Sequence, residues 1–247
     1  MITRRHVLIG AGGAALVGCD QLHRSESFRG GLRVFEGLNM QAQRTLGLGQ
    51  NLAREFREDQ RSPTFRGNGN MRPDTPDYQR LAAGGFADWR LRVDGLVARP
   101  LSLTLAQVQA SPGRTQVTRH DCVEGWSAIG KWHGAVLGPI LDAAGLRDEA
   151  RYLVFHCMDR FGDRPYYESI DLVDAFHPQT ILAYGLNDAF IPVTNGAPLR
   201  LRVERQLGYK HAKYIERIEA VASLDGIYGG KGGYWEDVGD YEWYAGI

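Results

Sequence analysis

One cysteine, Cys122, lies among several side chains that could take part in chemistry, in the stretch Thr118-Arg-His-Asp-Cys-Val-Glu-Gly-Trp-Ser127. A thiolate is both a nucleophile and a metal ligand, and cationic neighbours favour it over the neutral thiol. The arginine and histidine before the cysteine favour a thiolate, whereas Asp121 and Glu124 oppose it. These residues leave three interpretations open: a nucleophile, a metal ligand, or a buried structural cysteine.

The nucleophile interpretation requires a base in contact with the thiol, and His120, His133 or His156 could supply it. Structural zinc would need about four nitrogen or sulfur ligands at CxxC or HxxxH spacings, and the sequence contains no such set. A disulfide between Cys122 and Cys157 is a further alternative if the protein is exported.

A second group of residues that could do chemistry lies in two glycine-containing turns, Asn195-Gly-Ala-Pro-Leu-Arg200 and Gly208-Tyr-Lys-His-Ala-Lys213. Such turns expose backbone amides, and with the cationic side chains close behind they could hold a phosphate or another anion. The alternative is a hairpin turn with solvated surface cations. Arg200 alternates with Leu199 and Leu201, a pattern that predicts a position on the outer face of its strand.

The first 18 residues have the features of an export signal. Arg4 and Arg5 form a positive start, and residues 7–17 are an uncharged apolar and glycine stretch, too short to span a hydrocarbon core of roughly 30 Å. The arginine pair and the sequence Leu16-Val-Gly-Cys19 predict twin-arginine export and lipidation of Cys19, on the periplasmic side of the cell membrane. The alternative is a buried N-terminal helix. Because the twin-arginine route carries folded proteins, it also favours a bound cofactor.

Length and composition are those of a globular protein that can bury a core, with 247 residues of which 43% are hydrophobic. The 29 basic and 29 acidic residues give no net charge, so the composition indicates no nucleic-acid partner. After a signal peptide over residues 1–18, we predict an extended, wrapping segment over residues 19–84 and one domain over residues 85–247.

The elements that must position these residues are predicted from periodicity and turn formers. Strands are expected over residues 89–94, 152–156, 199–203 and 214–224. Helices are expected over residues 51–57, 104–109, 137–144 and 170–176. Thr104 caps the second helix, Gly145 ends the third, and the rest of residues 20–85 is predicted to be irregular. Because helices and strands mix without a βαβ rhythm, we predict an α+β fold in a single domain.

Five segments together resemble the molybdopterin domain of the sulfite oxidase superfamily. They are the segments 89–103, 119–127, 177–180, 195–200 and 208–213. Their order and spacing match that family over about residues 62–240. The resemblance implies a mixed, β-rich molybdopterin-binding fold and a molybdenum-molybdopterin cofactor.

The resemblance assigns Cys122 as the thiolate ligand of molybdenum, a role that suits a soft sulfur donor. It also implies that the cofactor is bound by Asn68, Cys157, Asn195, Arg200, His211, Ala212 and Lys213. Asn195 and Arg200 match pterin-binding positions, and residues 211–213 match the segment that holds the phosphate end of the cofactor. By the same resemblance, Cys157 lines the pocket and is not a disulfide partner.

The residues after Cys122 differ from those of animal and plant sulfite oxidases, which have arginines there that hold the sulfite dianion. Val123-Glu-Gly-Trp-Ser127 instead resembles the Cys-Val-Glu-Ala-Trp-Ser sequence of the periplasmic methionine-sulfoxide reductase catalytic subunits. The resemblance therefore implies oxygen-atom transfer with reduction of a sulfoxide or a similar neutral oxide. Those reductases have Pro-Trp-Lys-Tyr-Gly where this chain has Arg205-Gln-Leu-Gly208, so the substrate can differ.

Three alternatives to this function remain open at this point. They are sulfite-type oxidation with a cytochrome acceptor, a cofactor-free thiol enzyme, and a binding lipoprotein that keeps the fold. The sequence has no CxxCH motif for haem attachment, so electrons must be exchanged with a partner. The candidates for this partner are a cytochrome b subunit in the membrane and a soluble cytochrome, and the substrate is expected to be a small molecule. Attachment to the membrane through a lipid on Cys19 would keep the enzyme near either cytochrome.

Overall fold

The computed structural model describes residues 25–46 and 51–247, and the chain divides into two compact units between Leu46 and Gly47. The first unit contains one described element, helix α2 (Glu26–Leu46). The predicted irregular chain is therefore wrong here. The helix was not predicted because α2 contains three glycines, and each glycine lowers helix propensity by about 1 kcal/mol. The predicted signal peptide and Cys19 lie outside the described residues.

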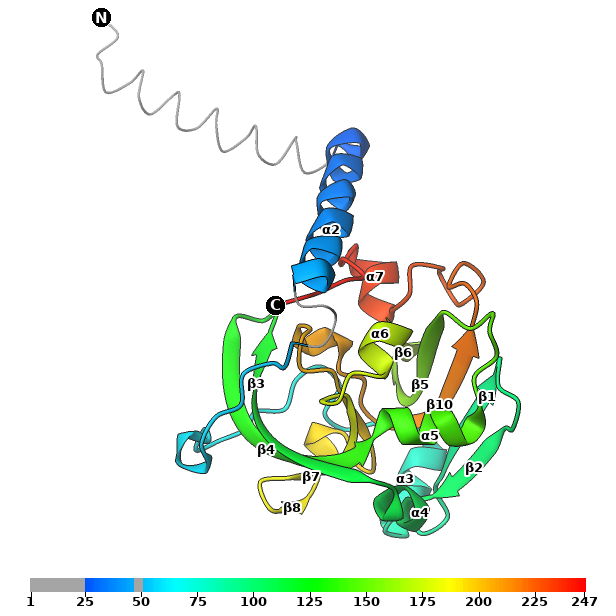
Figure 1. The fold of residues 1–247 in the computed structure, drawn as a ribbon. Coiled ribbons are helices and arrows are strands. Elements are labelled where there is room, and N and C mark those ends of the chain that lie inside the picture. Colours follow the sequence, from blue (N-terminus) through cyan, green and yellow to red (C-terminus); the bar gives the residue numbers. More distant parts are fainter. Residues whose placement is uncertain (1–24, 47–50) are drawn as a thin grey trace, which may run out of the picture. The chain divides into compact units, whose positions relative to one another are not determined.

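The second unit is built on two sheets (Figure 1). The first has the order β2-β1-β10-β5-β6, and only its β1–β10 pair is parallel. Its strands are β1 (Arg90–Gly95), β2 (Leu101–Thr104), β5 (Tyr152–Phe161), β6 (Arg164–Asp171) and β10 (Ile215–Val221). The second sheet has the order β3-β4-β7-β8, with β9 also paired to β7. Its strands are β3 (Gly113–Cys122), β4 (Trp126–Val136), β7 (Ile181–Leu186), β8 (Ala189–Phe190) and β9 (Arg200–Arg202).

Short helices connect and cover these sheets. They are η1 (Glu58–Gln60), α3 (Pro76–Ala83), α4 (Leu105–Ala110), α5 (Leu137–Ala144), α6 (Leu172–Ala175), η2 (Val193–Asn195), η3 (Gly208–Lys210) and α7 (Tyr234–Gly239). The prediction for α4 is confirmed, since Thr104 Oγ1 accepts a hydrogen bond from the Gln107 amide at 3.1 Å. The end of α5 is confirmed as well, with Gly145 in the left-handed region at φ 68°.

The helix predicted over residues 51–57 is wrong. Glu55 instead forms an isolated antiparallel bridge with Thr118 of β3, and the Phe56 amide donates to Val117 O at 2.8 Å. Pairing with the edge of β3 satisfies backbone groups that a short helix would leave open at both ends. The helix predicted over residues 170–176 forms only as the single turn α6.

One hydrophobic core joins the two sheets. It contains buried residues from each, among them Leu91, Phe155 and Ile218 of the first sheet and Trp132, Leu182 and Leu201 of the second. The alternation predicted for β1 is confirmed, because Leu91 and Val93 are buried between exposed or half-buried neighbours. Helices and a mostly antiparallel set of strands thus share one core, which confirms the predicted α+β, β-rich fold in a single domain.

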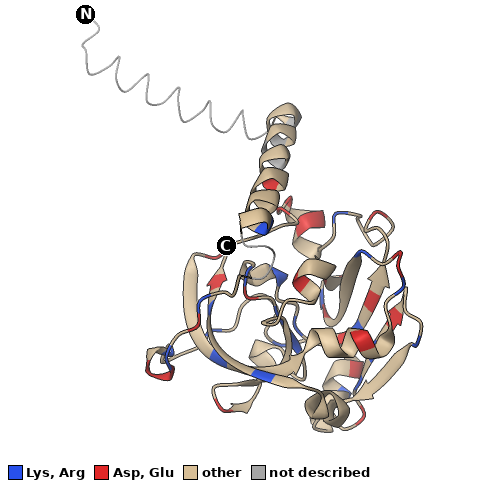
Figure 2. Ribbon diagram, viewed as in Figure 1, with Lys and Arg blue, Asp and Glu red and all other residues tan. Residues whose placement is uncertain are grey.

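Charged residues of both signs are distributed over the elements of the second unit (Figure 2). Three of them form a buried cluster: Lys210 Nζ lies 2.7 Å from Glu236 Oε1 and 3.0 Å from Glu168 Oε2, and all three side chains are almost fully buried. Burial lowers the pKa of Lys210, but the two carboxylates outweigh burial and raise it above its ordinary value. The cluster ties η3 and β6 to α7.

Replacing Lys210 by methionine is expected to destabilise the fold by about 3–5 kcal/mol, because it leaves two carboxyl groups buried without a cation. Those groups must then take up protons on folding, so the loss should shrink as pH falls from 8 to 5. Urea unfolding at several pH values measures this. Lys231→Met, which breaks an exposed pair with Asp240 at 2.8 Å, should change stability by no more than about 0.5 kcal/mol. Equal losses in the two variants would contradict the prediction.

Candidate functional site

Cys122 is the last residue of β3, at the turn into β4. Burial alternates along this end of the strand, so that His120 and Cys122 point into the domain and Arg119 and Asp121 point away. Asp121 is held on the outer face by Arg119 Nε at 2.9 Å and by Ser127 Oγ at 2.5 Å. Of the two acidic neighbours that oppose a thiolate, only Glu124 therefore faces the same side as the thiol.

A cavity of about 260 Å³ opens at Cys122. Of the predicted site residues, Asn68, His211 and Lys213 line it together with the cysteine. Strands β5 and β6 contribute Asp159, Phe161 and Tyr166, and the C-terminal segment contributes Trp235 and Tyr241. The fold thus brings five segments that are distant in the sequence to one cavity.

The surroundings of the Cys122 thiol do not favour a free thiolate. Burial raises its pKa and the charge of Glu124 adds to this, whereas the Glu124 backbone amide and the charge of Arg200 act in the opposite direction. Among the described residues, no histidine is hydrogen-bonded to the sulfur: His133 contacts Thr115 and Tyr184, and His156 contacts other partners. A metal ion, by contrast, would displace the thiol proton outright.

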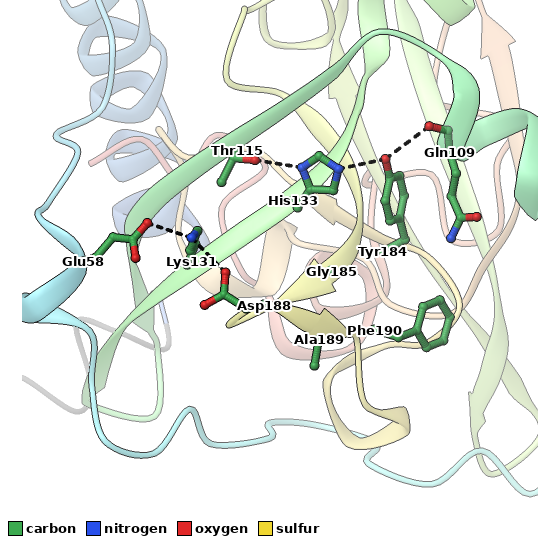
Figure 3. Close-up of a pocket in the computed structure, with 10 residues that line it drawn as sticks. All are labelled: Glu58, Gln109, Thr115, Lys131, His133, Tyr184, Gly185, Asp188, Ala189 and Phe190. Atoms are coloured by element: carbon green, nitrogen blue, oxygen red, sulfur yellow. Dashed lines mark hydrogen bonds and ion pairs between the residues drawn. The ribbon is translucent and has the colours of Figure 1, made fainter.

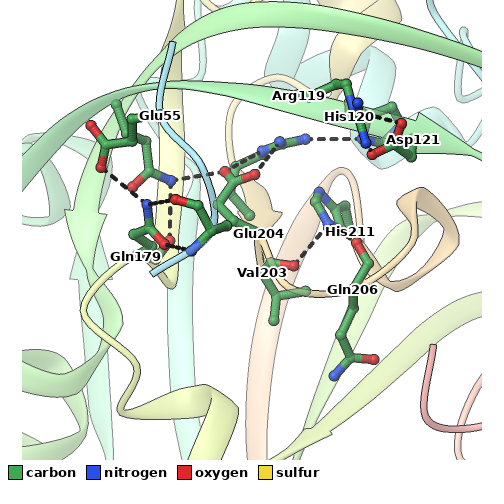
Figure 4. A network of polar contacts seen from close by, with 12 residues as sticks. Glu55, Arg119, His120, Asp121, Gln179, Val203, Glu204, Gln206 and His211 are labelled. Carbon is green, nitrogen blue, oxygen red and sulfur yellow. Dashed lines mark hydrogen bonds and ion pairs between the residues drawn. The ribbon is translucent and has the colours of Figure 1, made fainter. Parts of the chain in front are cut away.

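The His120 ring is buried behind the cavity wall. Its Nδ1 lies 3.0 Å from Arg202 Nη1, and because a guanidinium can only donate, the proton of the neutral ring is on Nε2 (Figure 4). Burial and the neighbouring cations hold the pKa of His120 well below its ordinary value. The Nε2–H group is therefore a donor, and it is buried without a partner. Gly208 makes room for the ring, since a Cβ there would overlap it.

His211 has the opposite tautomer. Its Nε2 lies 3.1 Å from both Val203 O and Gln206 O, and because both are acceptors, Nε2 must carry the proton. Burial, followed by the charges of nearby arginines, holds the pKa of His211 well below its ordinary value. Its Nδ1 is thus an acceptor, buried without a partner in the cavity wall.

Lys213 fixes the loop that contains Asn68. Its Nζ donates to Asn68 O at 2.6 Å and to Asn70 O at 2.5 Å. Burial and the charge of Arg200 lower the pKa of Lys213 to about 7, and the charge of Asp159 opposes this shift. The side-chain oxygen of Asn68 is buried without a partner.

Arg200 is fully buried, so the predicted outer-face position is wrong. All three residues of β9 are buried, because Trp132 covers the face that alternation assigns to solvent: Arg200 Cζ lies 5.4 Å from the centroid of its ring. Arg200 Nη1 donates to Asn195 O at 3.1 Å, but Nε and Nη2 have no partner. Burial and the charge of Arg202 lower its pKa to about 9. The Asn195 side chain holds the turn by donating to Arg66 O at 3.3 Å.

Four predicted cofactor residues lie outside the cavity lining, namely Asn195, Arg200, Cys157 and Ala212. Cys157 is buried in the core on β5, and both it and Cys122 are free thiols, so the disulfide alternative is not realised. Ala212 is fully buried, and its carbonyl accepts from the Leu201 amide at 2.8 Å. Their cofactor-binding roles stay predictions. Sequence reasoning missed Asp159, because a lone aspartate late in a strand matches no motif.

The polar groups around the cavity fit an anionic ligand rich in heteroatoms. Unpartnered buried donors are present on Arg200 and His120, and unpartnered buried acceptors on His211 and Asn68. Buried polar groups are normally hydrogen-bonded, so this concentration of open positions indicates a bound partner. Within the described ranges, no group of three His, Cys, Asp or Glu side chains could hold a metal ion. A metal at Cys122 would therefore need further ligands from a cofactor, as molybdopterin with its dithiolene sulfurs provides.

A larger cavity, of about 580 Å³, lies along β4 and β7 and does not include Cys122 (Figure 3). Its ionisable side chains are already paired. His133 lies between Thr115 Oγ1 at 2.8 Å and Tyr184 OH at 3.2 Å, and Lys131 lies between Glu58 and Asp188. This cavity is the larger of the two, but the unpartnered buried polar atoms lie near the cavity at Cys122. We therefore take the cavity at Cys122 as the candidate functional site.

The sequence of this chain is similar to those of several known proteins. A family model described as "Oxidoreductase molybdopterin binding domain" matches residues 78–225. YedZ1 of Azospira oryzae, a candidate protein-methionine-sulfoxide reductase subunit, is 43% identical over 160 residues, which cover 65% of this chain and 56% of that protein. MsrP of Gluconobacter oxydans, a protein-methionine-sulfoxide reductase catalytic subunit, is 34% identical over 143 residues, or 53% of this chain and 46% of that protein.

The chain spans about half the length of these relatives. Among solved structures, the sulfane dehydrogenase SoxCD from Paracoccus pantotrophus superimposes with a TM-score of 0.50 at 20% identity, over 56% of this chain and 39% of that chain. At that identity the similarity is one of fold.

Proposed function

Because the chain belongs to the oxidoreductase molybdopterin-binding domain family, we propose that it is an enzyme of the bacterial cell envelope that reduces a sulfoxide or a similar neutral oxide. Membership of this family confirms the resemblance drawn from the five sequence segments. The observation that supports the proposal most directly is the cavity at Cys122, which is lined by a buried thiol, by the Lys213 cation and by unpartnered polar atoms of Asn68 and His211. When bound, the molybdenum-molybdopterin cofactor supplies the two-electron oxygen-atom transfer.

The residues of the chain would then hold the cofactor. Cys122 would ligate the metal through its thiolate, and Arg200 and Lys213 would neutralise the anionic cofactor. His120 Nε2–H and His211 Nδ1 offer a donor and an acceptor of fixed type, because hydrogen bonds on their other nitrogens set each tautomer. Such groups can orient a bound heterocycle without rearranging on binding. The protein therefore contributes a preorganised set of hydrogen-bonding groups.

The charge around the cavity favours a neutral substrate over sulfite. Glu124 lies exposed at the cavity and accepts a hydrogen bond from Trp126 Nε1 at 3.0 Å, so a carboxylate faces an incoming ligand. Exposed Val123 and the aromatic rings of Trp235 and Tyr241 would contact the alkyl groups of a sulfoxide. The name of the MsrP relative from Gluconobacter oxydans supports the same substrate class.

The electron partner in this proposal is a haem protein, either a cytochrome b subunit in the membrane or a soluble cytochrome. We propose a periplasmic location, with Cys19 as the lipidated anchor after twin-arginine export. The anchor would keep the enzyme close to either partner. No helix within residues 25–46 and 51–247 is both long and apolar enough to cross a membrane.

Metal and pterin analysis of the purified protein, combined with a substrate screen, tests the proposed function. We expect molybdenum and molybdopterin in a one-to-one ratio with the chain, and oxidation of a reduced viologen dye by sulfoxides or N-oxides. Turnover of sulfite with cytochrome c in place of oxides would favour the sulfite-type alternative. Activity without molybdenum would indicate a thiol enzyme, and neither metal nor activity would indicate a binding lipoprotein.

A further inference from the structure

Asp159 is a buried carboxyl group in the wall of the Cys122 cavity, and the cofactor-binding roles above do not use it. The residue lies near the end of β5, and only 2% of it is exposed. Its Oδ1 is buried and has no hydrogen-bond partner. A buried carboxyl oxygen without a hydrogen-bond partner, on a residue that lines a cavity, is costly to the fold, and the cost points to a ligand or a function.

The environment of Asp159 places the pKa of its carboxyl group near neutral pH. Lys213 is the cation that acts on it, and its other titratable neighbours are Tyr78, Tyr166, Tyr214 and Cys157, each with a pKa raised by burial. Burial raises the pKa of Asp159 to about 7, although the charge of Lys213 opposes the shift. An acid whose pKa lies close to the working pH is best suited to proton transfer.

The other buried titratable groups of the cavity already use their protons. Lys213 donates to backbone carbonyls, and so does His211 through Nε2. Tyr166 OH donates to the Tyr209 carbonyl at 2.9 Å, and Tyr209 OH donates to a carbonyl at 2.5 Å. None of these protons is directed at the space in front of Cys122.

The two remaining acids of the lining are less suitable. Glu124 is exposed and its carboxylate is engaged by Trp126, and Tyr241 is 36% exposed at the cavity mouth. Groups in contact with water gain little from the enclosed environment that makes a positioned acid effective. By this comparison Asp159 is the acid best placed to serve a substrate bound beside the metal position.

We propose that Asp159 is the proton donor to the oxygen atom that leaves the substrate, an inference that rests on the proposed function. The reduction R₂S=O + 2e⁻ + 2H⁺ → R₂S + H₂O breaks the sulfur–oxygen bond, reduces the sulfur and forms water. The haem partner, or a dye in the assay, supplies both electrons. Asp159 supplies one of the two protons and is reprotonated from solvent through the cavity mouth.

The pH dependence follows from the direction of proton transfer. A donor must be protonated, so kcat should be highest below about pH 7 and should fall as the pH rises through the Asp159 pKa. Asp159→Asn keeps the size and neutral charge of the protonated form but has no acidic proton. We therefore expect kcat to fall by about 10²–10⁴-fold and the alkaline decline to disappear from what remains. Asp159→Glu should restore part of the rate and the decline.

The experiment measures molybdenum and pterin content, kcat against pH with a sulfoxide and reduced viologen, and the carboxyl stretch in infrared spectra across the same pH range. Asp163→Asn, in the exposed turn between β5 and β6, is the matched control and should behave as the wild type. Support for the proposal is full cofactor content in Asp159→Asn with a slow, flattened profile and loss of the titrating carboxyl band.

Two results would overturn the role of Asp159. A cofactor content that falls in step with activity would make it a cofactor ligand, and an unchanged rate and profile in Asp159→Asn would make it a structural group. Neither result affects the proposed function. If the molybdenum-loaded wild type reduces no sulfoxide or N-oxide, the proposed function fails instead, and the proton-donor role fails with it.

Discussion

Replacing Cys122 by alanine is expected to lower reductase activity by more than about 100-fold. Loss of an outer-shell partner of a metal ligand typically costs about 10–100-fold in metal affinity or activity, and loss of the ligand itself should exceed that. The fold should survive, because the side chain is small and lies at the cavity edge, where truncation costs about 1 kcal/mol. Activity and stability should therefore separate in this variant.

Molybdenum content, turnover of a sulfoxide with reduced viologen and the urea midpoint, measured on the same preparation, test this expectation. Ser127→Ala is the matched control, because Ser127 lies in the same hairpin but its hydroxyl contacts Asp121 on the outer face. It should keep its metal and its rate. A Cys122→Ala protein with wild-type turnover would show that the reaction does not depend on the thiolate, and the proposed metal site would then be wrong.

The parts of the fold that could be predicted from the sequence are those fixed by local chemistry. Thr104 caps α4 because its hydroxyl accepts an amide of the first turn, and Gly145 ends α5 because it adopts a positive φ freely. Leu91 and Val93 point inward because β1 has one buried face. In each case the signal lies within a few residues of the structure it determines.

The predictions that failed depend on distant partners. The chain around Glu55 is extended because it pairs with the edge strand β3, and the sequence of residues 51–57 contains no signal for that pairing. Arg200 is buried because Trp132 covers the polar face of β9, whereas alternation alone assumes that this face meets water. Tertiary packing overrides the local pattern in both cases.

The site was predictable only where a family motif marks it. Spacing alone left Cys122 open between a nucleophile, a ligand and a structural cysteine, and the resemblance selected the ligand. The structure then contributes what motifs do not contain: the two histidine tautomers, the open positions on Arg200, and Asp159. These features depend on burial and on contacts between distant segments, so no local spacing reveals them.

Arg200 and Arg202 are both buried on strand β9, and we expect their substitution to change the free energy of unfolding in opposite directions. Arg202 is fully paired: its Nε and Nη2 donate to Glu204 at 2.9 and 2.5 Å, and both side chains are buried. Arg202→Met would leave Glu204 buried without its cation, and we expect a loss of about 3–5 kcal/mol. Arg200 has no carboxylate partner, and two of its nitrogens are open.

In protein from cells that cannot make molybdopterin, Arg200→Met should therefore be neutral or stabilising by up to about 4 kcal/mol, because it removes a buried charge that has no carboxylate partner and only one hydrogen bond. In cells that make the cofactor, the same variant should lose most of its pterin and molybdenum, and with them the stabilisation that a ligand of the native state provides. Urea unfolding of both variants, with and without cofactor, measures the direction and size of each change in stability. A large loss of stability for cofactor-free Arg200→Met would mean that contacts within the protein already stabilise the guanidinium. Arg200 would then not be a residue that binds the anionic cofactor.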